Sequence, residues 1–479
     1  MNKNFKGLKI AIIAGQGAEG CGVQRIGTEL DNYCNSHNMQ SEFYSYYTGK
    51  KYSRQNAHGT KINFFSPKDI PDLVEKLNKY DLVVFTSYPH NKIEHSAIKA
   101  FYYDLFCKLT KPIKAVYNLE IMKMNIDKIG YLGLLVNGAD IVFHYGLDTW
   151  FSKTVDKLGM KKIGDRLHRF HLWMDFSELD VIKKQYPLEK KQLGLVSVTR
   201  WSSLKNIGRT IEIQNHLLKL NPNWFCQVHG VERSIGAKFD IIDRPDVTYV
   251  NPSGKRDGNG AVEVYGPIAR AKGLELMGKY LYSSSFFSLP KTPWDYGNRM
   301  EYSQIENAYL GIPLFDTHWG QNNKNKEGKN FYDIPYSAIY SNGKDCKEVA
   351  EKLIELSKQP EELKKYEECS TLLSKNEYDC NIVIPEALEL ILSKGKQDNV
   401  LSDYEFNKKI VNEEFANEIL KLEKENKIPV LGIDEYEKKI VYYLDGHKQK
   451  LVKKINDKVD KKKTENEKVH INNKAKSLF

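Results

Sequence analysis

Short apolar runs alternate with longer amphipathic segments over the first third of the chain. Residues 8–14 form a near-continuous apolar run, which is typical of a strand buried in a parallel sheet. By the same pattern, strands are predicted at residues 8–14, 80–86, 113–119 and 139–144. Helices are predicted between them at residues 23–34, 96–109 and 129–137. Strands and helices that alternate in this way predict a doubly wound α/β domain.

A second series of the same kind begins at the buried run of residues 193–199. Further strands are predicted at residues 224–232, 262–267, 285–289 and 314–316. Helices are predicted at residues 207–220, 274–282, 301–310, 345–357, 360–374 and 382–393. The fold class is therefore α/β with two Rossmann-like domains, as expected for a chain of 479 residues, which is too long for a single core.

Changes in composition place the domain boundaries. Residues 1–172 form the first domain, and the Lys-rich residues 173–192 read as a linker. Residues 193–380 form the second domain, and residues 381–399 a further helix. Residues 400–479 alternate charged and apolar positions at helical spacing, and their last part has the polar composition of a disordered segment.

Charge and cysteine content narrow the functional class. Lys and Arg number 72 against 62 Asp and Glu, a net charge of +10 that favours a polyanionic partner. The seven cysteines show no metal-site spacing, so no metal site is predicted and a reduced, cytoplasmic setting is expected. The N-terminus lacks the features of a signal peptide, and without a run of 18 apolar residues no membrane span is expected.

The first strand runs into a glycine-rich loop that includes Gly20 and Gly22. Glycines let the backbone approach a ligand closely, and the amides at the start of the next helix point at the loop. Strand, loop and helix in this order suit a phosphate or a sugar. The spacing matches neither a dinucleotide fingerprint nor a P-loop, and an ordinary tight turn is equally compatible with it.

Two cations follow the strand at residues 193–199. Arg200 and Lys205, five residues apart, suit a diphosphate, because Arg can bind it bidentately and Lys as a point charge. They would also stabilise the charge that develops on a departing nucleotide diphosphate. The alternative is a pair of surface cations at the end of a loop.

Two carboxylates, Glu301 and Glu306, lie on the predicted helix 301–310. A Gly-x-Pro turn follows, and it leads into an apolar run. A carboxylate that faces a cleft from such a helix can accept hydrogen bonds from a ribose diol. A solvated helix surface is the alternative interpretation.

Carboxyl ends of parallel strands are where such domains bind ligands. Glu120 follows the strand 113–119, a position for a catalytic or substrate-holding carboxylate or for a helix N-cap. Tyr265 and Gly266 end another strand, where a nucleotide base could lie against the backbone. Near the C-terminus, residues 448–463 hold eight lysines, which suit either salt-dependent contact with nucleic acid or a solvated or oligomerising arm.

Taken in order, these motifs resemble the DNA α-glucosyltransferases of T-even phages, which are retaining glycosyltransferases of the GT-B fold. The resemblance spans about residues 8–395. Its motifs are the loop at residues 19–23, the turn at 229–234, the pair 265–266, and the helix at 301–306 with the turn at 311–315.

The resemblance implies a fold and an activity. Two domains would face a cleft, with the helix 381–399 returning toward the first. The enzyme would move a sugar, with retention, from a UDP-sugar to the hydroxymethyl group of 5-hydroxymethylcytosine in double-stranded phage DNA. Such DNA modification serves restriction evasion and takes place in the host cell cytoplasm. No metal or other cofactor is implied, and the oligomeric state is left open.

The resemblance also assigns roles to residues. Arg200 and Lys205 would hold the diphosphate, Glu306 the ribose, and Glu301 the region of the donor sugar. Glu120 would lie on the acceptor side and assist removal of the hydroxymethyl proton. The other donor-binding residues implied are Gly20, Gly22, Glu232, Arg233, Tyr265, Gly266 and Tyr302.

Three positions depart from the family pattern. Leu119 and Glu120 stand where the family has a His-Asp pair, Asn206 replaces a glycine, and Asn298 occupies a position that is often Glu in this fold. The sugar is therefore open between glucose and a pentose such as arabinose. Two other functions stay open: transfer to a cell-surface polysaccharide or a lipid-linked acceptor, and a catalytically inactive DNA-binding relative.

Overall fold

The computed structural model shows two compact units, which are described separately below. The first holds residues up to 144, residues 152–168 and residues from 389 onward, and the second holds residues 145–151 and 169–388. The residues whose structure is described are 5–14, 22–46, 60–65, 69–86, 105–106, 108–118, 138–144, 166–169, 171–199, 207–231, 243–283, 302–312, 315–316, 327, 329, 333–337, 339–340 and 345–396.

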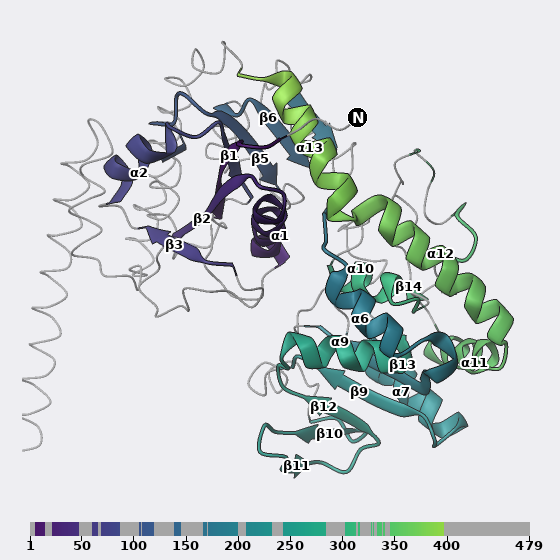
Figure 1. The fold of residues 1–479 in the computed structure, drawn as a ribbon. Coiled ribbons are helices and arrows are strands. Elements are labelled where there is room, and N and C mark those ends of the chain that lie inside the picture. Colours follow the sequence, from purple (N-terminus) through teal and green to yellow (C-terminus); the bar gives the residue numbers. More distant parts are fainter. Residues whose placement is uncertain are drawn as a thin grey trace, which may run out of the picture. The chain divides into compact units, whose positions relative to one another are not determined.

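The first unit is built on a sheet of seven described strands (Figure 1). Their spatial order is β3 (Ile62–Phe65), β2 (Gln40–Tyr46), β1 (Lys9–Ala14), β4 (Leu82–Phe85), β5 (Ile113–Asn118), β6 (Ile141–His144) and β7 (Leu167–Arg169). The pairs from β3 to β6 are parallel, and chain order reverses direction beside β1. A doubly wound sheet was predicted from the apolar runs, and this order confirms it.

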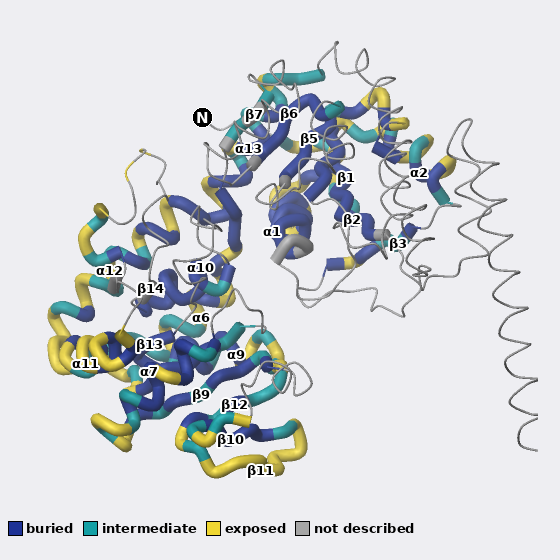
Figure 2. Tube along the Cα trace, turned by 180° about the vertical axis from the view of Figure 1, so that it is seen from behind, coloured by how far each residue is buried: buried dark blue, intermediate teal, exposed yellow. Residues whose placement is uncertain are grey.

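Helix α1 (Gly22–Ser36) packs against β1 and β2 of this sheet. Helix α2 (Ile70–Leu77) lies in the same unit. Gly27 of α1 lies against Ile12, Phe43 and Thr86, so close that an added methyl would clash with Phe43 and Ile12. Most of α1 is buried (Figure 2), as its position across the sheet requires.

The second unit has a sheet of six described strands with the order β11 (Arg256–Asp257), β10 (Val247–Val250), β12 (Val262–Tyr265), β9 (Phe225–His229), β8 (Gln192–Val198) and β13 (Tyr280–Ser283). Pairing is parallel except at β11, which forms an antiparallel edge. A separate parallel pair joins β14 (Phe315–Asp316) to β15 (Ile339–Tyr340). The helical elements are α6 (Ser177–Gln185), η6 (Leu188–Lys190), α7 (Ile207–Leu220), α9 (Arg270–Lys279), α10 (Tyr302–Tyr309), α11 (Cys346–Ser357) and α12 (Pro360–Tyr378). Helix α13 (Cys380–Lys394) begins in this unit, and its residues from 389 onward belong to the first.

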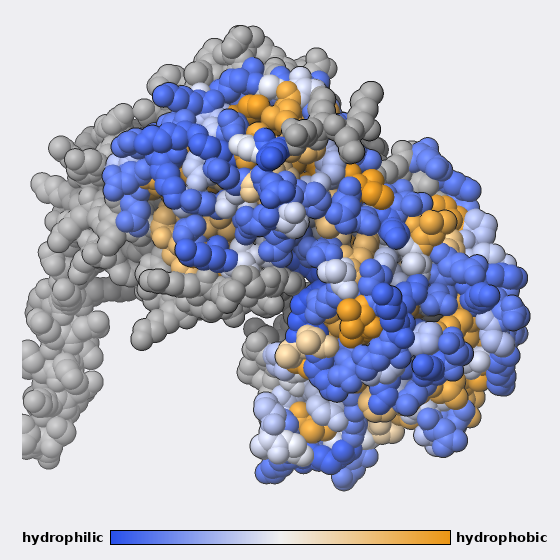
Figure 3. Space-filling view, in the orientation of Figure 1, coloured by the Kyte–Doolittle hydropathy of each residue, from blue (hydrophilic) through white to orange (hydrophobic). Residues whose placement is uncertain are grey.

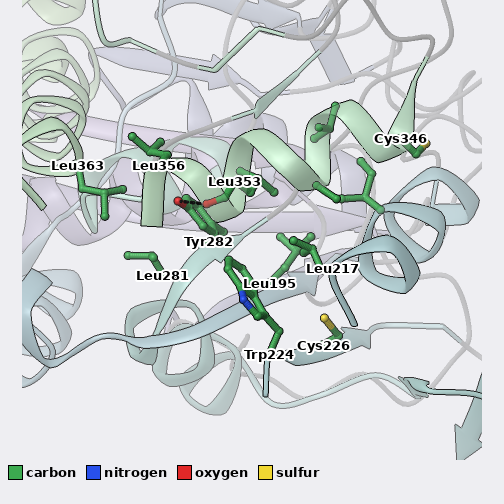
Figure 4. Close-up of a cluster of buried hydrophobic side chains, with 13 residues drawn as sticks. Leu195, Leu217, Trp224, Cys226, Leu281, Tyr282, Cys346, Leu353, Leu356 and Leu363 are labelled. Atoms are coloured by element: carbon green, nitrogen blue, oxygen red, sulfur yellow. Dashed lines mark hydrogen bonds between the residues drawn. The ribbon is translucent and has the colours of Figure 1, made fainter. Parts of the chain in front are cut away.

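The core of the second unit lies between the sheet and helices α7 and α11. Figure 4 shows Leu195 of β8, Leu217 of α7 and Leu353 of α11 in one buried cluster with Tyr282. The Tyr282 hydroxyl donates to the Leu353 carbonyl at 2.9 Å, which satisfies the polar end of a fully buried ring. Cys226 belongs to the same cluster, and burial raises the pKa of its thiol to about 12.

The outward sides of the helices are polar. On the face shown in Figure 3, hydrophilic residues make up most of the described surface and apolar residues form separate small patches. Among the described residues, no helix has the length and apolar character needed to cross a membrane.

Three sequence-based expectations for the second unit need correction. The helix predicted at 274–282 is α9, which ends at Lys279, and Tyr280 and Tyr282 belong to β13 because they pair with β8. The predicted linker 173–192 contains α6, which packs against α9 and lies within this unit. No strand was predicted between residues 232 and 262, where the structure has β10 and β11. In each case tertiary packing outweighs local composition.

Candidate functional site

The carboxyl ends of β9 and β12 are joined by their loops. Gly230 donates from its backbone amide to the Gly266 carbonyl at 3.0 Å, and Val231 donates to the Tyr265 carbonyl at 3.1 Å. Gly230 has φ of +105°, a conformation that glycine adopts without strain. Two of the predicted donor-binding residues, Tyr265 and Gly266, are therefore held by backbone bonds at the sheet edge where α/β domains bind ligands.

The Tyr265 side chain belongs to a polar network on β9 and β12. Its hydroxyl donates to Glu263 Oε2 at 2.6 Å, and the same oxygen accepts from Gln227 Nε2 at 2.8 Å. Arg256 Nη2 lies 2.5 Å from Glu263 Oε1. Burial opposes ionisation of Glu263, but these hydrogen bonds outweigh it and lower the pKa of the carboxyl. Burial and the Glu263 contact raise the pKa of Tyr265 to about 12, so its hydroxyl stays protonated.

His229 lies at the end of β9 beside this network. Its ring stacks on the Tyr265 ring, with centroids 4.6 Å apart and planes inclined by 14°. Its Nε2 lies 3.0 Å from Gln227 Oε1, and an amide oxygen can only accept, so Nε2–H donates. Burial lowers the pKa of His229 to about 4, so the imidazole is neutral at neutral pH.

Glu306 lies in the middle of α10, a helix that the sequence predicted. Its side chain is buried, with 5% of the residue exposed. Arg270, the first residue of α9, forms an ion pair with it from Nη1 to Oε1. Through Nε, Arg270 also donates to Glu178 Oε2 of α6 at 3.1 Å. A buried carboxylate of this kind needs a paired cation to stay ionised, and Arg270 supplies it.

Helix α10 is fixed to its neighbours by other contacts as well. The Tyr309 hydroxyl donates to Asp180 Oδ1 at 2.6 Å, and the Tyr309 ring stacks on Phe176 at 3.9 Å. Tyr302, a predicted donor-binding residue, is buried at the start of the helix. The helix ends at Gly311, whose φ is +71° and whose amide donates to the Ala308 carbonyl at 3.1 Å. This left-handed glycine is a common C-terminal cap.

The first unit presents small residues at the carboxyl ends of its central strands. Ala14 of β1 lies opposite Ser45 of β2, and the Thr86 amide donates to the Ile13 carbonyl at 3.0 Å. The hydroxyl groups of Ser45 and Thr86 are buried and have no hydrogen-bond partner in the part of the chain that the structure describes. Gly22, a predicted ligand-approaching glycine, is the first residue of α1, which begins after β1. The edge predicted to meet the ligand thus carries small and partly polar residues.

Helix α1 also carries a buried ion pair. Arg25 Nε lies 2.9 Å from Glu29 Oε1, and both residues are 6% exposed. Charged residues are rarely buried to this extent unless they are paired. The first turns of α1 therefore combine a glycine start with a buried cation, a combination that the sequence pattern did not single out.

Seven of the predicted site residues lie outside the described residues, and their roles stay predictions. They are Gly20, Glu120, Arg200, Lys205, Glu232, Arg233 and Glu301. The sequence analysis missed Arg270 and Glu178, which pair beside Glu306 in the second unit, and Thr86, which follows β4 in the first unit. Arg270 had one usable signal, because a cation at the first position of a helix opposes the helix dipole.

Within the described ranges, no three His, Cys, Asp or Glu side chains converge as they would around a metal ion. Arg270 places a positive charge beside Glu306.

Comparisons with known proteins give matches among solved structures. No protein-family profile matches the chain, and no curated protein sequence matches it. An α-glucosyltransferase bound to UDP and a 13-mer DNA containing a HMU base is similar, with a TM-score of 0.65, 17% identity, and coverage of 81% of this chain and 100% of the other. The same kind of enzyme with UDP-glucose and DNA containing an abasic site gives a TM-score of 0.64 at 16% identity, with the same coverage.

A third similar structure is the Anabaena protein HepE in complex with UDP-glucose. It has a TM-score of 0.53 at 11% identity, and the match again covers 81% of this chain and all of the other. At these identities the likeness establishes the fold. The chain has the GT-B fold, in agreement with the α/β class and the two Rossmann-like units expected from the sequence.

Proposed function

We propose that this protein is a retaining glycosyltransferase that moves a sugar from a UDP-sugar to the hydroxymethyl group of 5-hydroxymethylcytosine in double-stranded DNA. The observation that carries the donor half is Glu306, a buried carboxylate that forms an ion pair with Arg270 on a helix followed by a glycine turn. GT-B structures with UDP and with DNA are similar to this chain over 81% of its length, which supports the same pairing of ligands.

The proposed donor site assigns each group a task. Glu306 accepts hydrogen bonds from the ribose hydroxyls, and Arg200 and Lys205 bind the diphosphate. Glu301 is proposed to contact the donor sugar or its phosphates, Tyr302 to contribute to donor binding, and Tyr265 and Gly266 to flank the base. Gly20, Gly22, Glu232 and Arg233 complete the donor contacts implied by the family resemblance.

In the reaction, the acceptor hydroxymethyl oxygen forms a bond to the anomeric carbon as the bond to the diphosphate breaks. Arg200 and Lys205 stabilise the negative charge that UDP takes away. The proton of the hydroxymethyl group leaves with Glu120 as the proposed acceptor. These cations make a metal or other cofactor unnecessary, and we place the reaction in the cytoplasm.

DNA is proposed to bind through Lys and Arg contacts to its phosphates, which position the duplex without reading its sequence. The hydroxymethyl group lies in the major groove, so the enzyme must reach it there or extrude the base. Phage DNA and protection from restriction fit this chemistry. The transferred sugar is proposed to be glucose or a pentose such as arabinose.

Release of UDP tests the assignment of donor and acceptor together. The full chain is incubated with UDP-glucose or UDP-arabinose and with hydroxymethylcytosine DNA, unmodified DNA or a lipid-linked acceptor. We expect UDP release above background only with hydroxymethylcytosine DNA, and we expect Arg200→Ala and Glu306→Ala to abolish it. Release driven by the lipid-linked acceptor would favour the alternative acceptor class, and DNA binding without release would favour an inactive relative.

A further inference from the structure

Arg270 occupies a position that its own helix disfavours. It is the first residue of α9 and follows Ala269, whose backbone is extended. The start of a helix carries a partial positive charge, so a cation there is destabilising unless other groups compensate it. The first turn of α9 contains no acidic residue. Compensation comes instead from two carboxylates on other helices, Glu178 of α6 and Glu306 of α10.

The two carboxylates differ strongly in their access to solvent. The side chain of Glu178 is 48% exposed, that of Arg270 is 22% exposed, and that of Glu306 is only 6% exposed. Arg270 contacts them through different nitrogens, Nε for Glu178 and Nη1 for Glu306. Its guanidinium is therefore held by the outer carboxylate while it pairs with the inner one, which has the greater need of a counter-charge.

Contacts other than this ion pair also attach α10 to its neighbours. Tyr309 already binds Asp180 and stacks on Phe176, and Gly311 closes the helix. The contact from Arg270 acts on the Glu306 carboxylate itself. It favours the ionised form and one orientation of the side chain, because a planar guanidinium binds carboxylate oxygens in fixed directions.

We propose that Arg270 is a positioning residue that makes Glu306 a charged acceptor able to distinguish ribonucleotides from 2′-deoxyribonucleotides. The proposal rests on the proposed function, in which Glu306 binds the ribose. An ionised carboxylate accepts from both ribose hydroxyls, and hydrogen bonds to a charged group are stronger than those between neutral groups. A nucleotide without the 2′-hydroxyl loses one of these bonds. Arg270 thereby sets how strongly the enzyme prefers UDP over 2′-deoxy-UDP.

The test measures the dissociation constants of UDP and 2′-deoxy-UDP for the full chain by calorimetry. Wild type is expected to prefer UDP. In Arg270→Met the apolar stem stays and the charge is lost, so we expect the preference for UDP to fall by roughly tenfold. Arg270→Lys restores the charge without the planar fork and is expected to give an intermediate preference. Thermal unfolding of each variant reports whether the fold is kept.

Lys272 provides the matched control. It lies two residues further along α9 and pairs at 2.9 Å with Glu275, with 57% of its side chain exposed. Lys272→Met removes a cation from the same helix without touching Glu306, so it is expected to bind both nucleotides as wild type does. Its behaviour separates a general loss of positive charge from a loss at Arg270.

Two different failures can be told apart. A wild-type preference for UDP in both Arg270→Met and Arg270→Lys would overturn the role of Arg270 and leave the proposed function intact. A wild-type protein that binds neither nucleotide would contradict the proposed function together with this inference.

Discussion

At the scale of single residues, the neutral state of His229 has a measurable consequence. Burial lowers its pKa from an ordinary value near 6.5 to about 4. Between these two values the unfolded chain binds a proton that the folded protein does not, so the free energy of unfolding falls as the pH falls through this window. The polar network on β9 and β12 is thus expected to lose stability in mild acid.

His229→Gln tests this effect, because glutamine can still bond to Gln227 but does not titrate. Between pH 7 and pH 4.5, wild type is expected to lose about 2 kcal/mol more of its unfolding free energy than the variant. Denaturant unfolding at several pH values provides the measurement. Parallel pH profiles for the two proteins would show that His229 is not held neutral.

Thr86 offers a second test at this scale. Its hydroxyl is buried without a partner, whereas the equally buried Thr60 hydroxyl donates to Asn32 Oδ1 at 3.3 Å. Thr86→Val removes an unpaired polar group and is expected to raise the free energy of unfolding by about 1 kcal/mol. Thr60→Val, in the same unit, is expected to lower it by a similar amount. A loss of stability in both variants would mean that Thr86 has a partner in the folded protein.

The sequence pattern identified Glu306 as a candidate site residue but did not identify its partner, Arg270. Glu306 was found because a helix followed by a glycine turn is a local pattern, readable within a dozen residues. Arg270 contacts carboxylates that lie 36 and 92 positions away in the chain. No periodicity in the sequence links such distant positions, so the contacts of Arg270 with Glu178 and Glu306 can be recognised only in the folded structure.

At the scale of elements, the end of α10 depends on Gly311. Its φ of +71° disfavours any side chain, and an added Cβ would lie 2.3 Å from Cγ of Glu367 on α12. Gly254 has a similar φ of +82° with open space around it. Gly254→Ala is therefore expected to cost about 1 kcal/mol of unfolding free energy, from the backbone alone.

Gly311→Ala adds crowding to the same backbone strain, so its cost is expected to exceed that of Gly254→Ala. Glu367→Ala in the same protein removes the crowding and should return the cost to the level of Gly254→Ala. Chemical denaturation of the three variants checks both statements. Equal costs for the two single glycine variants would contradict the close approach of α12.

Helices and strands were predicted well where the local sequence pattern determines them, and poorly where packing against other elements determines them. The helix predicted at 207–220 is α7 with the same bounds, since it has one continuous apolar side. The helix predicted at 274–282 ran through Tyr280 and Tyr282, which pair with β8 instead. Gly278 explains the close packing there, because an added Cβ would lie 2.3 Å from Ile182 of α6. The helix α6 was missed for the same reason, since its polar composition reads as a linker.

At the scale of the whole molecule, the apolar runs of the sequence predicted the two parallel sheets. They did not predict which residues bind the acceptor. A doubly wound arrangement could be expected because right-handed crossovers leave few ways to place alternating strands and helices. The acceptor side depends on Glu120 and its surroundings, which lie outside the described residues. The sequence departs there from the family it resembles, because Leu119 and Glu120 stand where the family has a His-Asp pair.

Residues 448–463 form a lysine-rich segment that we expect to contact DNA phosphates. We expect replacement of its eight lysines by glutamine to weaken binding to duplex DNA and to leave UDP binding unchanged. Each lost phosphate contact should make the slope of log affinity against log salt less negative by about 0.9. Filter binding at several salt concentrations measures the slope. An unchanged slope would mean that these lysines form a solvated or oligomerising arm.

Mass spectrometry of nucleosides tests the central claim most directly. The full chain is incubated with duplex DNA that contains hydroxymethylcytosine and with each of a panel of UDP-sugars, and the DNA is then digested to nucleosides. We predict that hydroxymethyldeoxycytidine gains the mass of one sugar with at least one donor, and that Glu306→Ala abolishes the gain. No gain in mass with any donor would contradict the proposed activity.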